Sequence, residues 1–153
     1  MVVVKQEIGA RALLFDMLVD EDPGQLSEGN PFRFFTVEKL QQSVMREVTD
    51  LLNTRRSFLK FDDVVWRSTL AYGMGDHAGA SINSENDKAL IAEDIQQTVK
   101  RFEPRLIGVT VEVLEIDSSS ESLIVIIHAT LKAGKINQQF SFQVAIGSEP
   151  QGE

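Results

Sequence analysis

The stretch Phe102-Glu103-Pro104-Arg105-Leu106-Ile107-Gly108-Val109 separates two parts of the chain that have different hydrophobic periods. Before it, apolar residues recur every three or four positions, as on one face of a helix: Ile91, Ile95, Val99 and Phe102. After it, apolar residues alternate with others, as in a strand: Ile107, Val109, Val111 and Val113. Proline cannot continue the helical hydrogen-bond ladder. The stretch therefore predicts a helix that ends at Phe102, followed directly by a strand.

Further helices are expected before this boundary. Ser84, with Asp87 three residues later, resembles a capping box at the start of the helix that ends at Phe102. Thr36 is a suitable N-cap for an earlier amphipathic helix that ends near Asn53, a residue able to take a left-handed cap conformation. The buried face of that helix is predicted from its spacing: Val37, Leu40, Val44, Val48 and Leu51. Short helices are also expected at 12–19 and, less clearly against a strand, at 64–72.

Two more strands are expected after the first one. Residues 123–131 alternate but are also apolar on the second face at Ile124 and Ile126, which predicts a central strand. Phe140, Phe142, Val144 and Ile146 predict a third strand, and the short connections suit hairpins. The expected fold is α+β, with N-terminal helices packed on a C-terminal antiparallel sheet of three or four strands. One domain is predicted over 1–153, with a core of 11–146, a loop at 20–31 and a tail at 147–153.

Composition excludes several functions. The chain has 153 residues and a formal charge of -8, which disfavours binding to phosphate backbones, so no nucleic-acid partner is expected. It has no cysteine, which excludes disulfides and thiolate metal sites and suits a reducing compartment. No stretch approaches the ~20 apolar residues of a membrane helix, and the first residues do not form an export signal. Direct membrane insertion and export are therefore not expected.

Four motifs occur in an order that resembles a known family. They are Leu14-Phe15-Asp16-Met17-Leu18, Leu51-Leu52-Asn53-Thr54-Arg55-Arg56, Leu70-Ala71-Tyr72-Gly73-Met74-Gly75-Asp76 and Phe102-Glu103-Pro104-Arg105-Leu106. The set resembles the TssE-type subunits of type VI secretion baseplates, within the phage tail wedge family whose members are often labelled lysozyme-like. The resemblance covers roughly 12–146. One departure is Gly75, where the family pattern usually has proline, which is expected to loosen that loop.

The resemblance implies a structural role. Such a subunit would join larger wedge proteins in a baseplate and help initiate the contractile sheath, so its partners would be wedge proteins and sheath subunits. The implied place is the cytoplasm, in a baseplate docked at the inner membrane. No cofactor and no small-molecule substrate are implied.

The resemblance also points to the Glu103-Pro104-Arg105 turn as a partner-binding motif. Proline stiffens a turn, and arginine suits planar, bidentate partners at interfaces. Without the resemblance, the simpler interpretation is a helix stop with two solvated charges, which usually contribute little.

A second candidate surface combines a corner with a glycine-rich loop. The corner could bind a partner, or it could be a polar helix end whose basic residues complement the helix dipole. Trp66 is expected in the core, and Tyr72 could be an interface anchor. The partner-binding candidates here are Asn53, Thr54, Arg55, Arg56, Tyr72, Gly73 and Asp76.

Two other classes of function are weighed against the structural role. A peptidoglycan hydrolase needs two carboxylates, one of them kept protonated, and Glu103 is the obvious acid. The cation of Arg105 beside it favours the charged carboxylate, so no catalytic residue is assigned. A free-standing binding module is the third class. His77 and His128 lie far apart in sequence, so no metal site is expected, and His128 is interpreted as a structural residue.

Overall fold

The computed structural model describes residues 10–11, 34–57, 68–77, 84–117 and 122–147. In this part of the chain the helices are α2 (Val37–Asn53), a 3-10 helix (Thr69–Ala71) and α3 (Glu85–Phe102). The strands are β1 (Ala10–Arg11), β2 (Phe34–Phe35), β3 (Leu106–Asp117), β4 (Ser122–Ala133) and β5 (Ile136–Ile146). The expectations for a helix at 12–19, a loop at 20–31 and the core position of Trp66 lie outside the described residues. Of the predicted tail at 147–153, only Gly147 is described, and of the segment at 64–72 only the 3-10 helix and its flanks are.

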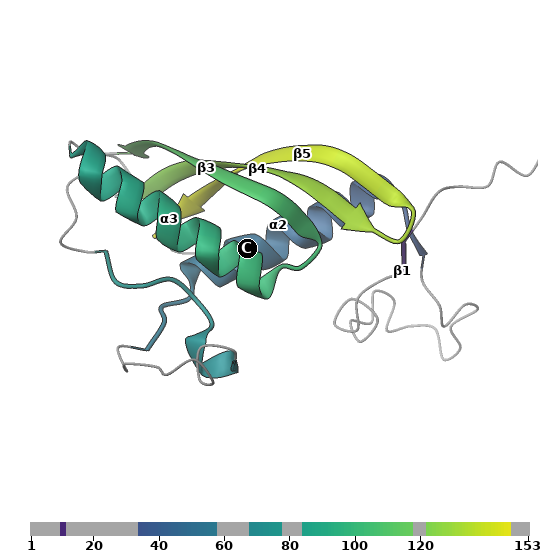
Figure 1. Cartoon of the computed structure of the whole chain (residues 1–153), viewed down its shortest axis with the longest axis horizontal. Helices are drawn as coiled ribbons and strands as arrows, with labels where there is room; N and C mark the ends of the chain where they lie inside the picture. The colour runs from purple at the N-terminus through teal and green to yellow at the C-terminus, as the bar shows by residue number, and fades with distance from the viewer. Residues whose placement is uncertain (1–9, 12–33, 58–67, 78–83, 118–121, 148–153) are drawn as a thin grey trace, which may run out of the picture.

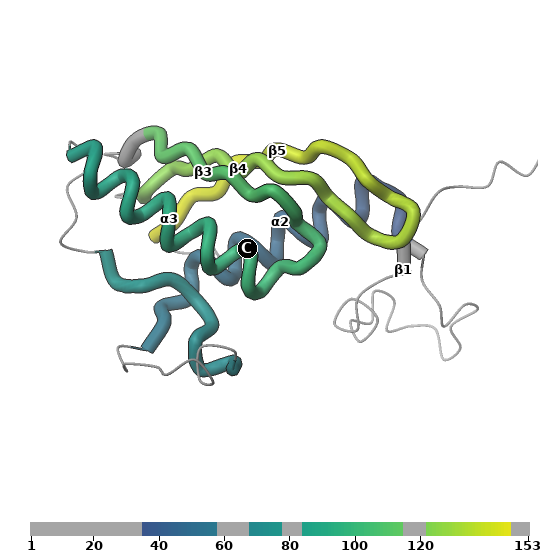
Figure 2. Tube along the Cα trace, viewed as in Figure 1, coloured from purple at the N-terminus to yellow at the C-terminus, as the bar shows by residue number. Residues whose placement is uncertain are grey.

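β3, β4 and β5 form one antiparallel sheet with β4 in the centre, as predicted for the strand that is apolar on both faces. The two long helices lie on one side of this sheet (Figure 1), with α3 packed mainly on β3 and α2 on β5. Figure 2 shows the three strands following each other along the chain as neighbours in space. β1 and β2 form a separate small antiparallel ladder. The predicted α+β fold is confirmed, with three strands in the main sheet.

Both helices begin where the sequence predicts. The Thr36 hydroxyl accepts the backbone N–H of Lys39 at 3.4 Å, and the Ser84 hydroxyl accepts that of Asp87 at 3.3 Å. Each bond satisfies a donor that the first helical turn leaves without a partner. In α3 the charges also complement the helix dipole, with acidic residues in the first turn and Lys100 and Arg101 in the last.

The end of α2 differs from the prediction. Asn53 is the last helical residue, and the cap is Thr54 in an extended conformation, with φ −89° and ψ 128°. The Thr54 hydroxyl donates to the carbonyl of Asp50 at 2.7 Å, and the Asn53 side chain donates to that of Thr49 at 2.9 Å. Side-chain donors therefore satisfy the last carbonyls, and no left-handed residue is needed.

The first strand contains a correction to the predicted alternation. Ile107 is 45 % exposed, whereas its neighbour Leu106 is buried. Between Ile107 and Thr110, β3 contains one residue more than the segment of β4 that pairs with it. This extra residue forms a β-bulge at Gly108, whose φ is +65°. The extra residue moves Ile107 to the outer face and keeps Val109 buried.

The core lies between the sheet and the two helices. Val44 and Val48 of α2, Ile95 and Val99 of α3, and Val125 and Ile127 of β4 have no exposed surface. At roughly 1.5–3 kcal/mol per fully buried aliphatic side chain, this layer is the main stabilising element of the fold. It also fixes the positions from which the polar residues of the next section project.

Candidate functional site

The Glu-Pro-Arg turn joins the end of α3 to the start of β3. The backbone N–H of Glu103 closes the last helical turn on the carbonyl of Val99 at 2.8 Å, and the Glu103 carbonyl accepts the N–H of Leu106 at 3.1 Å. The carbonyl of Arg105 accepts the N–H of Lys132 on β4 at 2.8 Å. The turn is therefore fixed on both sides by backbone hydrogen bonds, with Pro104 at the position that needs no donor.

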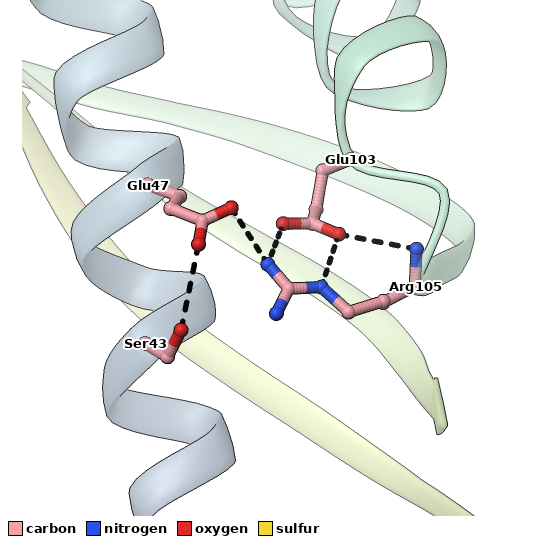
Figure 3. Close-up of polar contacts among 4 residues, drawn as sticks. All are labelled: Ser43, Glu47, Glu103 and Arg105. Carbon is pink, nitrogen blue, oxygen red and sulfur yellow. Dashed lines mark hydrogen bonds and ion pairs between the residues drawn. The ribbon is translucent and has the colours of Figure 1, made fainter. Parts of the chain in front are cut away.

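The side chains of this turn bind each other (Figure 3). Arg105 Nε donates to Glu103 Oε1 at 2.6 Å, and Arg105 Nη2 donates to Glu103 Oε2. The backbone N–H of Arg105 also donates to Glu103 Oε1, at 3.1 Å. The pair is bidentate, which is the strong geometry for guanidinium and carboxylate.

A third charged residue completes this group, which we call the Arg105 cluster: Glu47, Glu103 and Arg105. Arg105 Nη2 also donates to Glu47 Oε2 on α2 at 2.8 Å, and the hydroxyl of Ser43 lies 3.5 Å from the other Glu47 oxygen. One guanidinium therefore ties α2 to the junction of α3 and β3. Sequence reasoning missed Glu47, although its position between Val44 and Val48 places it at the margin of the buried face of α2.

The cluster is buried to different degrees. Glu103 is 3 % exposed, and the side chains of Arg105 and Glu47 are 12 % and 33 % exposed. The interpretation of this turn as a helix stop with two solvated charges is therefore wrong. Burial of such an ion pair adds little net stability, but removal of one partner leaves a buried charge without its counter-charge.

The corner after α2 holds the chain to β5. The Asn53 carboxamide donates to the carbonyl of Ala145 at 3.1 Å and accepts the backbone N–H of Gly147 at 2.9 Å. The Asn53 side chain thus makes the two hydrogen bonds that the backbone of one residue in a neighbouring strand would make with the end of β5. Arg55 is exposed, whereas Arg56 is half-buried.

The glycine-rich loop packs directly against this corner. The N–H of Met74 donates to the Thr54 carbonyl at 2.9 Å, and the N–H of Arg56 donates to the Met74 carbonyl at 2.8 Å. Gly73 has φ +103°, and a Cβ there would lie 2.4 Å from the Thr54 carbonyl oxygen. Only glycine fits such a position without movement of the backbone. Gly73 therefore shapes the corner by letting the two segments approach.

Asp94 of α3 is the centre of a second polar cluster. Its Oδ1 accepts from Arg56 Nη2 at 2.9 Å, and its Oδ2 lies 2.9 Å from His77 Nε2 and from the N–H of Gly75. Burial alone would raise the pKa of Asp94, but hydrogen bonds from His77, Arg56 and Gly75, together with the Arg56 charge, hold it below its usual value. Sequence reasoning missed Asp94, although it lies three residues after Ile91, next to the buried face of α3.

This cluster corrects the expectation for Gly75. The N–H of Gly75 donates to a carboxylate, and proline has no such donor. Glycine at this position therefore ties the loop to α3 and does not loosen it. A metal site is not found either: in the described ranges no group of three or more His, Asp or Glu side chains could hold an ion.

Tyr72 connects the loop to the Glu-Pro-Arg turn. Its ring and the Phe102 ring form a T-shaped contact, with a centroid distance of 5.3 Å and an interplanar angle of 69°, and Tyr72 is 36 % exposed. Partial burial, and then the charges of Asp50 and Glu47, raise the pKa of the phenol. The structure thus brings Tyr72 beside the Arg105 cluster, whereas Asp76 lies exposed further along the loop.

The remaining histidine lies on the outer face of the sheet. His128 is exposed on β4, and its Nδ1 lies 2.8 Å from the Ser141 hydroxyl on β5. This cross-strand bond agrees with a structural residue. No helix in the described part of the chain is long and apolar enough to cross a membrane.

Comparison with known proteins identifies the family. A search of curated proteins found no match. One solved structure that resembles the chain is a baseplate complex of the type VI secretion system, at 16 % identity and TM-score 0.48, covering 71 % of this chain and 95 % of that one. Another is a Geobacter sulfurreducens protein described as a tail lysozyme, at 16 % identity and TM-score 0.47, covering 77 % of this chain and 99 % of that one. The model of the family described as baseplate wedge protein gp25 matches residues 38–135, from α2 through α3, β3 and β4 to the turn before β5. The chain belongs to the baseplate wedge protein gp25 family.

Proposed function

We propose that the chain is a non-catalytic, TssE-type subunit of a type VI secretion baseplate, where it binds larger wedge proteins and helps initiate the contractile sheath. The observation that carries this proposal is the family match, because it includes both long helices, the Glu-Pro-Arg turn and two of the three sheet strands. The proposed place is the cytoplasm, in a baseplate docked at the inner membrane.

Within this role we assign two different tasks to the candidate residues. The exposed side chains of Arg55, Tyr72 and Asp76 are proposed to contact the wedge partners. The other candidates hold the surface in shape, through the contacts described above: Asn53, Thr54, Arg56, Gly73, Glu103, Pro104 and Arg105. Arginine and tyrosine are the residue types that most often anchor interfaces. Opposite charges, on Arg55 and Asp76, would then supply specificity.

The arrangement of carboxylates argues against the alternative of a peptidoglycan hydrolase. Glu103 is 3 % exposed and binds Arg105 with both oxygens, so a sugar oxygen has no access to it. Glu47, the other carboxylate nearby, binds the same guanidinium. A glycosidase needs one protonated and one ionised carboxyl group on opposite sides of the scissile bond. Here both carboxylates are occupied by one internal cation.

The test is co-purification from cells that express the wedge proteins, followed by mass spectrometry. The triple variant Arg55→Ala, Tyr72→Ala, Asp76→Ala should lose the wedge proteins while still folding, although loss of the Tyr72–Phe102 contact should lower its melting temperature. A matched triple variant at exposed positions of α3, β3 and β5, Gln97→Ala, Thr110→Ala and Gln143→Ala, should recover them as wild type does. Equal recovery by both triple variants would refute the assigned contact surface. Peptidoglycan hydrolysis that disappears in Glu103→Gln while the variant stays folded would refute the non-catalytic role.

A further inference from the structure

One end of the domain is basic, although the chain as a whole is acidic. Residues 96–110 and 128–141, which meet at this end of α3 and the main sheet, contain five of the chain's 15 basic residues and one of its 23 acidic residues. That single acid is Glu103, which is buried and bound to Arg105. The remainder of the chain is therefore more acidic than its formal charge of -8. We call the exposed cations of these two segments the basic end: Lys100, Arg101, Lys132 and Lys135.

The basic end combines two connections that are neighbours in space. The first is the turn from α3 to β3, and the second is the hairpin turn from β4 to β5 (Figures 1 and 2). The carbonyl of Arg105 in the first turn accepts the N–H of Lys132 at 2.8 Å, which places the last residues of β4 beside it. Lys135 follows in the hairpin turn itself. Cations that are far apart in the sequence therefore surround one end of the fold.

The usual structural uses of a surface cation explain only part of the basic end. Lys100 and Arg101 lie in the last turn of α3, where they complement the helix dipole. Lys132 lies on β4, the central strand, which has no open edge for a charge to protect. The first turn of α2 reaches the same end of the fold and adds Glu38 and Lys39, whose charges offset each other. The excess of positive charge at this end therefore calls for another explanation.

An exposed apolar side chain lies beside these cations. Ile107 is 45 % exposed and stands opposite Thr130 on the outer face of the sheet. Lys132, two residues further along β4, faces the same way and is a diagonal neighbour of Ile107, at a typical distance of roughly 7–8 Å. Leu70 and Leu90 are more exposed, so exposure alone does not single out Ile107. The bulge in β3 does, because bulges are frequent where a sheet redirects a side chain toward a functional surface.

The charge of this end selects the kind of partner. We infer that the basic end, together with Ile107, is a docking site for an acidic segment of another protein that carries an apolar residue among its carboxylates. Salt screens charges beyond about 8 Å, so a short segment is attracted by the nearby cations alone. Nucleic acid or an anionic membrane would extend past this end and meet the acidic remainder of the chain. The inference concerns a surface other than that of Arg55, Tyr72 and Asp76 and does not depend on the proposed function.

The first test is binding of a labelled synthetic peptide, rich in glutamate and with one central leucine, to the purified chain by fluorescence polarisation. Binding should weaken as salt rises from about 50 to about 300 mM. The variant Lys132→Glu, Lys135→Glu should bind the peptide at least about tenfold more weakly, because attraction becomes repulsion. The control Arg46→Glu, Lys88→Glu changes the charge equally elsewhere on α2 and α3 and should bind within about twofold of wild type. A wild-type chain that does not bind, or equal losses in both variants, would overturn the inference.

The same assay separates a protein segment from other polyanions. A short labelled DNA duplex should bind the chain more weakly than the peptide does, and so should vesicles that contain phosphatidylserine. Both present extended negative surfaces, which the acidic remainder of the chain repels. Tighter binding of either one would assign the basic end to phosphate groups and overturn the choice of partner.

The second test asks whether Ile107 contacts the apolar residue of the segment. Ile107→Ser should weaken binding of the leucine peptide by roughly three- to tenfold, as expected for loss of a partly buried apolar contact. It should not change binding of a peptide in which serine replaces the leucine, since the two changes remove the same contact. Leu90→Ser, a matched change of an exposed apolar residue on α3, should bind both peptides as wild type does. Circular dichroism checks that each variant is folded. Equal weakening of both peptides by Ile107→Ser would remove Ile107 from the docking site.

Discussion

The carboxylate of Glu103 and the guanidinium of Arg105 bind each other across a single proline, and only 3 % of Glu103 remains exposed. Two charged residues only two positions apart would usually both face water, but here the turn between α3 and β3 places both side chains against α2. Glu47 of α2 then adds a second carboxylate to the same guanidinium. The motif is therefore part of the domain's own structure, and its first measurable effect is on stability.

Removal of one member of the Arg105 cluster should destabilise the domain according to how deeply its counter-charge is buried. Arg105→Ala leaves Glu103 buried with no cation, and we expect a loss of about 3–5 kcal/mol in the free energy of unfolding. Glu47→Ala should cost less, because Glu47 is a third exposed and Glu103 still neutralises Arg105. Chemical denaturation with urea measures both, with Gln97→Ala as an exposed control. Equal midpoints for Arg105→Ala and the control would show that the cluster is not stabilising.

Asn53→Ala should weaken the attachment of α2 to the end of β5. The substitution removes the hydrogen bonds to Thr49, Ala145 and Gly147 and leaves these backbone groups to water. Because the site is exposed, we expect a modest loss of roughly 1–2 kcal/mol. Asn53→Asp keeps the acceptor for Gly147 but sets a carboxylate against the carbonyl of Ala145 at the negative end of α2, so it should be no more stable than alanine. Hydrogen exchange at Gly147 reports the same contact directly: its amide should exchange faster in Asn53→Ala.

Acid should destabilise the wild-type domain partly through Asp94. Its pKa is lower in the folded chain than the reference value of 3.8, so the folded state favours the ionised form. The stabilisation is then complete above the unfolded pKa and is lost as the pH falls through the folded pKa. Asp94→Asn should be less stable than wild type near neutral pH, and the difference should shrink as the pH falls below 3.8. A difference that stays constant with pH would contradict this assignment.

High pH should destabilise the domain partly through Tyr72, whose pKa is raised by folding, whereas that of Asp94 is lowered. Its pKa lies above 10.0 because of partial burial and the charges of Asp50 and Glu47, so folding favours the neutral phenol. That contribution is present below pH 10.0 and is lost as the pH rises through the folded pKa. Tyr72 is the single tyrosine of the chain, so ultraviolet absorbance titrates it without interference. The Glu47→Gln variant should titrate at lower pH than wild type, and an unchanged midpoint would remove Glu47 as a cause.

Hydrophobic period was sufficient to predict the layers of the fold. The change from helical to alternating spacing at Pro104 placed the end of α3 and the start of β3 correctly, because burial requires those periods in those elements. It could not place Ile107, since the bulge at Gly108 depends on the pairing with β4 and leaves no trace in the alternation. The cap of α2 was also wrong, because Asn53 makes its hydrogen bonds to β5, a strand far away in the chain.

The polar sites were only partly predictable. Glu103 and Arg105 stand out in the sequence, but whether they face a partner, water or each other depends on the position of α2. Glu47 and Asp94 were overlooked because a carboxylate at the margin of an apolar face resembles any other surface charge of an amphipathic helix. Their importance appears only when helix and loop from distant parts of the chain meet.

The attachment of α2 has a consequence for the order in which the domain folds. Its polar contacts span 58 residues, from Glu47 to Arg105, and 92 residues, from Asn53 to Ala145. The strands of the main sheet instead follow one another along the chain, and α3 directly precedes them. Closing a long loop costs more entropy than closing a hairpin, so α2 should dock after α3 and the meander have formed, and should detach first when the domain opens. The amides of α2 should then exchange through a lower-energy opening than those of β4.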